Sequence, residues 1–374
     1  MVDEKRLLSE FITLAGFDSE SFHEKDIAEY LLAKLNKLGL EALMDRAGAA
    51  QTGDEKAAGN IYGFLKGNIQ GEPILFSAHM DTVSPGVGKK VIVNEDGRVT
   101  SDGTTVLGSD DITAITAILE MLTVIKDKEL PHPDIEVVFF IAEELYCKGS
   151  KVFDYNRIKS KYAYTLDIDG RVGRVANRAP SIIQYEVTVE GKSAHAGFEP
   201  EKGVSAIVAA SNIISKLRLG RINSNTTANV GTINGGTGVN IVPELVTIKG
   251  EVRSLDKDEA SAVVESLRRQ FEKGAIENGV RVTFVSEEMV RAYKVAEDSF
   301  VIKKYAKALE RLGYGEPDII TSFGGSDNNN FCLHGIEGVV LSNAMNNVHT
   351  VSEYFYLDEL VKSAEIVLEL ATSL

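Results

Sequence analysis

Two histidines and three carboxylates stand where predicted strands end or a predicted helix begins. They are His79, Asp110, Glu144, Asp167 and His349. Open α/β sheets gather functional side chains at the carboxyl ends of their strands, so we expect these five residues to converge despite their distance in sequence. Imidazole and carboxylate ligands suit zinc or a similar divalent ion. The excess of carboxylates suggests two ions that share one bridging carboxylate.

Two more carboxylates adjoin these positions. Asp81 follows His79 by two residues, and side chains two apart on an extended segment point the same way. We therefore expect Asp81 to accept the second ring N–H of His79 and to fix its tautomer. Glu143 directly precedes Glu144 at the end of the apolar run "VVFFIAEE". One glutamate of this pair can bind metal while the other accepts a proton as general base.

Some of these positions have an ordinary structural explanation when each is taken alone. Asp110 and Asp111 together suit the first turn of a helix, where carboxylates are favourable. Asp169 is an alternative to Asp167 at the end of the run "YAYTLDID". The hypothesis of a metal site therefore depends on the combination of positions and not on any one of them.

The elements that must position these residues alternate between strands and helices. The runs "EPILFSAHMD", "DIEVVFFIAEE" and "YAYTLDID" predict strands, and their nearly continuous apolar character indicates a sheet covered on both faces. The segment after Ser21 predicts a helix, with Ser21 and Glu24 spaced for a capping box. Residues 109–126 predict a second helix, with Ile112, Ile115, Leu119 and Leu122 on one face.

The pattern changes near Pro180. The run "SIIQYEVTVEG" alternates between apolar and polar residues, which is typical of a sheet with one buried face. The elements that follow are predicted in the order β-α-β-β-α-β, the split, ferredoxin-like arrangement. We therefore predict an α/β domain over residues 1–179 and 291–374, interrupted by an inserted α+β domain over residues 180–290.

Composition narrows the class of protein. The chain has 374 residues and a formal charge of −15, which disfavours nucleic acid and anionic membranes as partners. The first residues do not resemble a secretory signal, and no apolar run reaches the ~18 residues of a membrane span. Two cysteines, Cys147 and Cys332, fit a reducing compartment, most simply the cytoplasm.

Six short segments carry a resemblance to a known family. In order they are "SAHMDTV", "GSDD", "AEEL", "TLDIDG", "GKSAHAG" and "NNVHTVSE". The chain resembles the di-zinc aminoacylase and carboxypeptidase family of metallopeptidases over essentially its whole length. "GGSDNNNF" and the close "HTVSE" are most similar to its peptidase T-like (tripeptide aminopeptidase-like) branch. In "EELYCKGS", Tyr146 adds bulk where the family usually has glycine, which bears on the shape of the pocket.

The resemblance implies a role for each position. His79, Asp110 and Asp167 would hold one zinc ion, and Asp110 would bridge to a second held by Glu144 and His349, with cobalt or manganese as substitutes for zinc. The other implied roles are general base for Glu143, orientation of His79 for Asp81, oxyanion stabilisation for His195, and substrate contact for Asn240, Arg253 and Gly325.

The implied fold is a zinc-exopeptidase-type mixed sheet with helices on both faces and a ferredoxin-like lid. The implied function is metal-dependent exopeptidase action on short peptides, with a homodimer through the lid as one arrangement. A deacylase of N-acyl amino acids on the same site is the first alternative. A catalytically silent, metal-dependent binding protein is the second, and an intact Glu143 beside Glu144 argues against it.

Overall fold

The computed structural model describes residues 1–373 and divides into two compact units. Unit 1 contains Met1–Arg178 and the chain from Lys294 onward, and unit 2 contains Ala179–Tyr293. The chain therefore leaves unit 1 once, builds unit 2 and returns.

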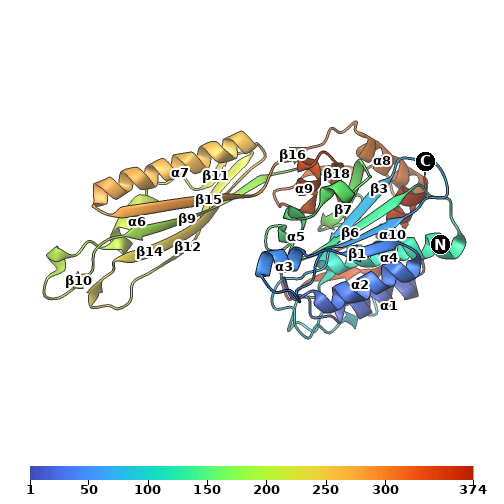
Figure 1. Ribbon diagram of the computed structural model, residues 1–374, viewed down its shortest axis with the longest axis horizontal. Helices are drawn as coiled ribbons and strands as arrows, with labels where there is room; N and C mark the ends of the chain where they lie inside the picture. The colour runs from blue at the N-terminus through green and yellow to red at the C-terminus, as the bar shows by residue number, and fades with distance from the viewer. Residues whose placement is uncertain (374) are drawn as a thin grey trace. The chain divides into compact units, whose positions relative to one another are not determined.

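A nine-stranded mixed sheet forms the centre of unit 1 (Figure 1). Its order is β1-β2-β6-β3-β7-β18-β8-β16, and β17 pairs with β8. The bounds are β1 Glu41–Met44, β2 Ile61–Leu65, β3 Ile74–His79, β6 Ile135–Phe140, β7 Tyr162–Ile168, β8 Arg174–Ala179, β16 Tyr293–Lys294, β17 Asp318–Thr321 and β18 Glu337–Ser342. The four central neighbours β6, β3, β7 and β18 run parallel, so their carboxyl ends share one edge of the sheet.

Helices cover both faces of this sheet. They are α1 Glu4–Ala15, α2 Lys25–Leu38, α3 Ala47–Thr52, α4 Ser109–Lys128, α5 Lys148–Lys151, α8 Phe300–Leu312, α9 Asp327–Leu333 and α10 Leu357–Thr372, with a 3-10 turn at Tyr155–Arg157. α4 packs on β3 and β7 and is covered in turn by α1 and α10. On the other face, Phe331 of α9 packs with Leu75, Phe140 and Ala163. Burial on both faces explains why the central strands are apolar throughout.

Unit 1 also contains a separate three-stranded sheet. It contains β4 (Ile92–Val93), β5 (Arg98–Thr100) and β19 (Tyr354–Tyr356). β19 pairs antiparallel with β5, so it ties the chain that follows β18 to the chain that precedes α4.

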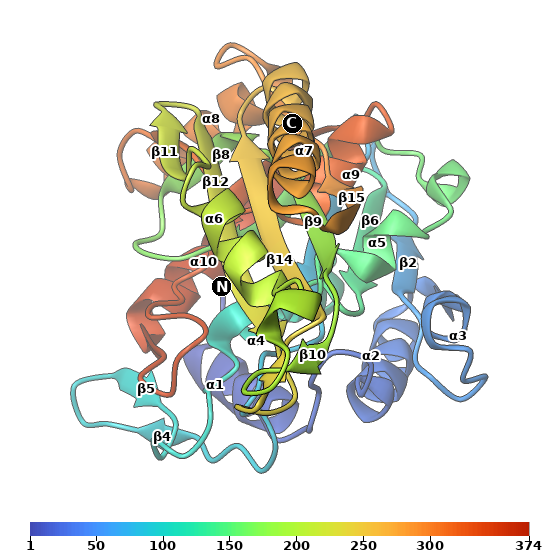
Figure 2. The ribbon, with the colours of Figure 1, turned by 90° about the vertical axis from the view of Figure 1, so that its left-hand side faces the viewer.

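Unit 2 is an antiparallel sheet with two helices on one face. The main strands are β9 Ser181–Glu190, β11 Gly220–Asn223, β12 Thr226–Gly235, β14 Leu245–Ser254 and β15 Arg281–Val290, and the helices are α6 Ala206–Ile214 and α7 Lys257–Asn278. The order β11-β12-β14-β9-β15 is the ferredoxin-like order with β11 added at one edge. Figure 2 shows α6 and α7 over these strands, where they pack on Val187 and Val189 of β9.

The predicted fold class is confirmed, and one local prediction was wrong. The apolar residues predicted on one face of α4 are buried, and most of its other residues are buried as well, because α1 and α10 cover its outer side. The helix α2 begins at Lys25 without a side-chain cap, because other groups use the two residues of the predicted capping box. The Ser21 hydroxyl donates to Asp81, and Glu24 Oε1 accepts the N–H of Ala142.

Within residues 1–373, no helix combines the length and the apolar character that crossing a membrane requires.

Candidate active site

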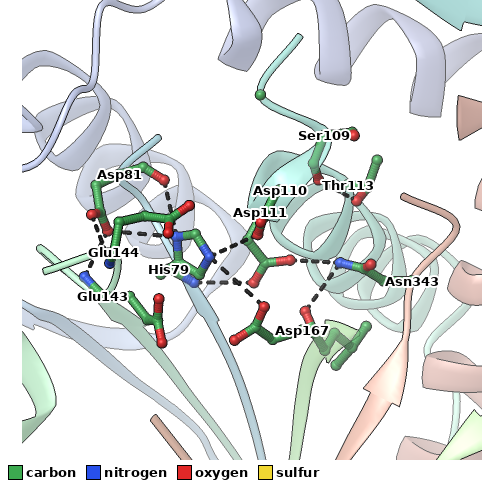
Figure 3. A network of polar contacts seen from close by, with 12 residues as sticks. His79, Asp81, Ser109, Asp110, Asp111, Thr113, Glu143, Glu144, Asp167 and Asn343 are labelled. Carbon is green, nitrogen blue, oxygen red and sulfur yellow. Dashed lines mark hydrogen bonds and ion pairs between the residues drawn. The ribbon is translucent and has the colours of Figure 1, made fainter. Parts of the chain in front are cut away.

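The carboxyl ends of the four parallel strands, together with the start of α4, bring the predicted ligands to one place. His79 ends β3, and Asp167 is the sixth residue of β7. Glu144 follows β6 and His349 follows β18 by short loops. Asp110 comes from the start of α4, where its backbone is not helical (φ −83°, ψ 98°). Figure 3 shows Asp110, Asp167 and Glu144 around the ring of His79.

Asp110 stands between the two histidines. Its Oδ1 lies 3.0 Å from His79 Nε2, and its Oδ2 lies 3.2 Å from His349 Nε2. Asp167 Oδ1 is 3.9 Å from the same His79 nitrogen, and Glu144 Oε2 is 3.0 Å from the same His349 nitrogen. The five residues thus form two groups, each of three ligand atoms within 4.8 Å of one another, that share Asp110.

This arrangement fits two divalent ions. Ligand atoms about 2.0–2.1 Å from a tetrahedral zinc lie about 3.3 Å apart, which is within the observed range of 3.0–3.9 Å. Each group offers one imidazole nitrogen and two carboxylate oxygens, a set suited to zinc and its neighbours. Glu144 Oε1 is also buried without a hydrogen bond to the described residues, and a cation would satisfy it. Asp169 is exposed and belongs to neither group.

The electrostatics of the cluster also favour a cation. Burial raises the pKa of Glu143 well above its usual range, and the carboxylate of Asp167 raises it further. Burial opposes ionisation of Asp110, yet its hydrogen bonds with His349 and His79 lower its pKa below the usual range. Hydrogen bonds with Asp110 and Glu144 raise the pKa of His349 to about 10. Bound divalent ions would supply the positive charge that lets these buried carboxylates ionise together.

Glu143 lies in a second, adjoining group. It is 9% exposed, and its carboxylate lies within 4.8 Å of the Cys147 thiol and the Asp327 carboxylate. The Cys147 thiol donates to Glu143 Oε1 at 3.2 Å, and Asp327 accepts the Ser150 hydroxyl at 2.5 Å. Burial raises the pKa of Asp327 to about 7. Glu143 is therefore a buried carboxylate that is held in place from outside the two metal groups.

Asp81 contacts the ring of His79 through its backbone carbonyl more closely than through its carboxylate. His79 Nδ1 donates to the backbone carbonyl of Asp81 at 2.9 Å, while the Asp81 carboxylate is 3.5 Å away. That carboxylate instead accepts the N–H groups of Glu143 and Glu144 at 2.9 and 3.2 Å and the hydroxyl of Ser21 at 2.7 Å. Asp81 thus fixes the backbone of the glutamate pair as well as the ring of His79.

Several supporting residues were missed because no short-range pattern marks them. Asp111 accepts the N–H of His79 at 3.2 Å, and its other oxygen accepts the side-chain amide of Asn343 at 2.5 Å (Figure 3). Glu353 accepts hydrogen bonds from the segment that carries Asp110. Each of these contacts joins residues more than 30 positions apart, so spacing within one element could not reveal them.

His195 and Asn240 come together in unit 2. β10 (Ala194–His195) pairs with β13 (Ile241–Val242), and the N–H of Ala196 donates to the carbonyl of Asn240 at 3.0 Å. His195 Nδ1 accepts the N–H groups of Gly197 and Phe198 at 3.1 and 3.2 Å. A neutral ring then carries its proton on Nε2, where it can donate a hydrogen bond to a substrate.

The two other predicted substrate contacts lie elsewhere. Arg253 of β14 donates to Glu251 of the same strand through Nε at 2.7 Å and Nη2 at 3.3 Å. Gly325 is half-buried just before α9 in unit 1. Tyr146 has a left-handed backbone (φ 65°), the conformation in which glycine is the usual residue.

The fold and this cluster define a metal-dependent hydrolase. Two family models match the chain: "Peptidase dimerisation domain" over residues 177–279 and "Peptidase family M28" over residues 60–202. The Bacillus subtilis protein YqjE, whose function is uncharacterised, is 41% identical over 98% of each chain.

Two solved structures are similar over nearly the whole chain. The aminopeptidase PepT from Bacillus cereus is 39% identical, with 99% of this chain and 98% of that chain covered and a TM-score of 0.89. A tripeptidase from Staphylococcus aureus is 34% identical, with 100% and 98% covered and a TM-score of 0.94. The chain belongs to the M20 family of metallopeptidases, in its peptidase T-like branch, and is a metal-dependent peptidase.

Proposed function

We propose that this protein is a di-zinc exopeptidase that removes the amino-terminal residue from short peptides. The observation that carries the proposal is the pair of three-ligand groups that share Asp110, with Glu143 buried beside them. The similar proteins named an aminopeptidase and a tripeptidase support the amino-terminal direction and the short substrate. The reducing compartment expected from two cysteines, both free in the structure, is proposed as the site of action.

The chain's own residues would divide the work as follows. When bound by His79, Asp110, Asp167, Glu144 and His349, two divalent ions supply positive charge that polarises a scissile carbonyl and acidifies water. Glu143 accepts a proton from the attacking water and returns it to the leaving amine.

Hydrogen bonds prepare two of these groups for their roles. The Cys147 thiol orients one oxygen of Glu143, and Asp81 holds the Glu143 backbone. His195, with Nδ1 occupied by backbone N–H groups, donates from Nε2 to the oxygen that gains negative charge.

Unit 2 suggests how His195 and Arg253 could both serve one substrate. On β14, Leu245 lies opposite Glu190 and Arg253 lies opposite Ile182. The eight residue steps from Leu245 to Arg253 separate these two positions by about 27 Å. β10, which carries His195, follows β9 beyond Glu190 (Figure 1), so it lies past the end of the sheet away from Arg253. An extended tripeptide spans only about 10–11 Å.

One copy of unit 2 therefore cannot present both residues to one short peptide. We propose a homodimer through unit 2 in which each site combines the metal ligands, Glu143 and Arg253 of one chain with His195 of the other. The match of the dimerisation model to residues 177–279 supports this. Inactive Glu143→Gln and His195→Ala chains, mixed under conditions that allow exchange, should recover about a quarter of the unmodified activity, because half of the dimers gain one complete site. No recovery in a demonstrably mixed dimer would refute it.

The substrate class is tested with three matched compounds. A tripeptide, its N-acetylated form and the N-acetyl derivative of its first amino acid are incubated with zinc-loaded protein, and the products are read by mass spectrometry. We expect release of the first residue from the free tripeptide only, and no release by Glu143→Gln. Hydrolysis of only the N-acetyl amino acid would identify a deacylase. Binding of all three without turnover would identify a silent binding protein.

A further inference from the structure

One buried glutamate, which is neither a proposed metal ligand nor the proposed base, accepts hydrogen bonds from the segment that carries Asp110. Glu353 is 1% exposed. Its Oε2 accepts the N–H groups of Leu107 and Gly108, both at 2.8 Å. Its Oε1 accepts the hydroxyl of Ser109 at 2.6 Å and the N–H of Asp110 at 2.9 Å. One carboxylate thus satisfies four donors on four consecutive residues.

Glu353 also belongs to the loop that carries His349. Asn346 and Tyr354 exchange two backbone hydrogen bonds, of 2.9 and 3.1 Å, and so close this loop. Within it, the N–H of Glu353 donates to the carbonyl of Thr350 at 3.1 Å. His349 has a left-handed backbone (φ 63°), a conformation that persists only where its surroundings hold it.

We propose that Glu353 is a positioning residue of the second metal group, which fixes the bridging ligand Asp110 against His349. These two ligands lie 239 positions apart in the chain and 3.2 Å apart in space. The carboxylate of Glu353 accepts a hydrogen bond from Asp110, and its backbone N–H donates one within the loop that carries His349. The proposal rests on the assignment of Asp110, Glu144 and His349 as a metal group.

The two metal groups should respond unequally to the loss of this link. In the second group, Glu353 supports two of three ligands, Asp110 and His349. In the first group it supports Asp110 alone, while His79 and Asp167 come from β3 and β7. Outer partners of metal ligands typically change affinity by about 10- to 100-fold when removed. The affinity of the second metal group for its ion should therefore fall by that factor, and the affinity of the first group should fall much less.

The variant Glu353→Gln tests this because it keeps the size of the side chain but replaces one accepting oxygen with a donor amide. Zinc affinities are measured by competition with a chelator on the full-length protein, with no substrate present. We expect one ion to bind as in the unmodified protein and one to bind about 10- to 100-fold more weakly. Cobalt spectra, recorded in parallel, should show the loss of one of two absorbing centres at limiting cobalt.

Glu136→Gln is the matched control. Glu136 is 0% exposed and accepts the hydroxyls of Tyr62 and Ser160 and the N–H groups of Lys159 and Ser160. It lies at the amino end of β6, at the other end of the strand from the glutamate pair. This variant should lose thermal stability, as Glu353→Gln should, but keep both zinc affinities.

Ser109→Ala is a milder change, and it tests the role of Glu353 if the Glu353→Gln variant does not fold. It removes one of the four contacts and should weaken the second ion in the same direction by a smaller factor. Two affinities unchanged in the folded variants, or both lowered by the same factor, would overturn the role of Glu353. An unmodified protein that binds only one ion would instead refute the second metal group itself, and the proposed di-zinc function with it.

Discussion

Removal of the metal ions should destabilise unit 1 and leave unit 2 unchanged. All five proposed metal ligands lie in unit 1. A chelator should therefore lower the free energy of unfolding of that unit alone. At a free ion concentration of 100 times the dissociation constant, each site contributes about 2.7 kcal/mol, and two sites about 5 kcal/mol. For a unit of about 260 residues, 1 kcal/mol shifts the melting temperature by roughly 2–4 °C, so the expected shift is about 10–20 °C.

The assay is differential scanning calorimetry of the zinc-loaded and the chelated protein. Hydrogen–deuterium exchange near each transition identifies the unit that unfolds. The shift should diminish at acidic pH, because burial raises the pKa of Glu144 and of Asp167 and these carboxylates must lose their protons to bind metal. A chelator that leaves the transition of unit 1 in place, or that moves the transition of unit 2, would refute the reasoning.

Substitutions at five residues test their individual roles. Glu143→Gln should keep both ions and lower turnover about 10²–10⁴-fold, whereas Glu144→Gln should lose one ion; the reverse pattern would exchange their roles. His195→Ala should lower kcat with metal content unchanged, and an unchanged kcat/KM would leave it a loop residue. A peptide with a free carboxyl terminus should be cleaved roughly ten- to a hundredfold faster than its amide, and Arg253→Met should remove that preference; equal rates on both would withdraw the carboxylate contact. Cys147→Ala should lower kcat about fivefold at constant KM, the value of one hydrogen bond of ~1 kcal/mol, and Cys147→Ser should restore it; equal loss in both variants would exclude the thiol contact.

The central sheet could be predicted because burial on both faces leaves a direct mark on the sequence. Mostly apolar runs such as Ile135–Phe140 and Ile74–His79, whose residues are all buried, are needed where helices cover both sides. Once the strands are parallel, their carboxyl ends must meet at one edge, so the convergence of His79 and Asp167 follows from the fold class. The alternation in β9 marked the one-sided sheet of unit 2 in the same way.

What could not be predicted depends on contacts between distant segments. The spacing of Ser21 and Glu24 satisfies a capping box, but a local pattern cannot show that Asp81 and the N–H of Ala142 lie within reach of their side chains. The link from Glu353 to Asp110 crosses 243 positions and leaves no periodic signal. The site roles of Asn240, Arg253 and Gly325 stay predictions, because they concern a substrate.

The division of unit 1 into two stretches of chain has a consequence for the order of events during synthesis. Ribosomes add about 5–20 residues per second, so unit 2 is complete for several seconds before β18 (Glu337–Ser342) and His349 are made. During that interval β7 lacks its partner β18 and presents a free strand edge, a form that invites pairing with other chains. The nascent chain already contains four of the five proposed ligands but not the fifth. The proposed second metal group is therefore complete only after translation has passed His349, so metal supply and chaperone protection would matter at the same late stage.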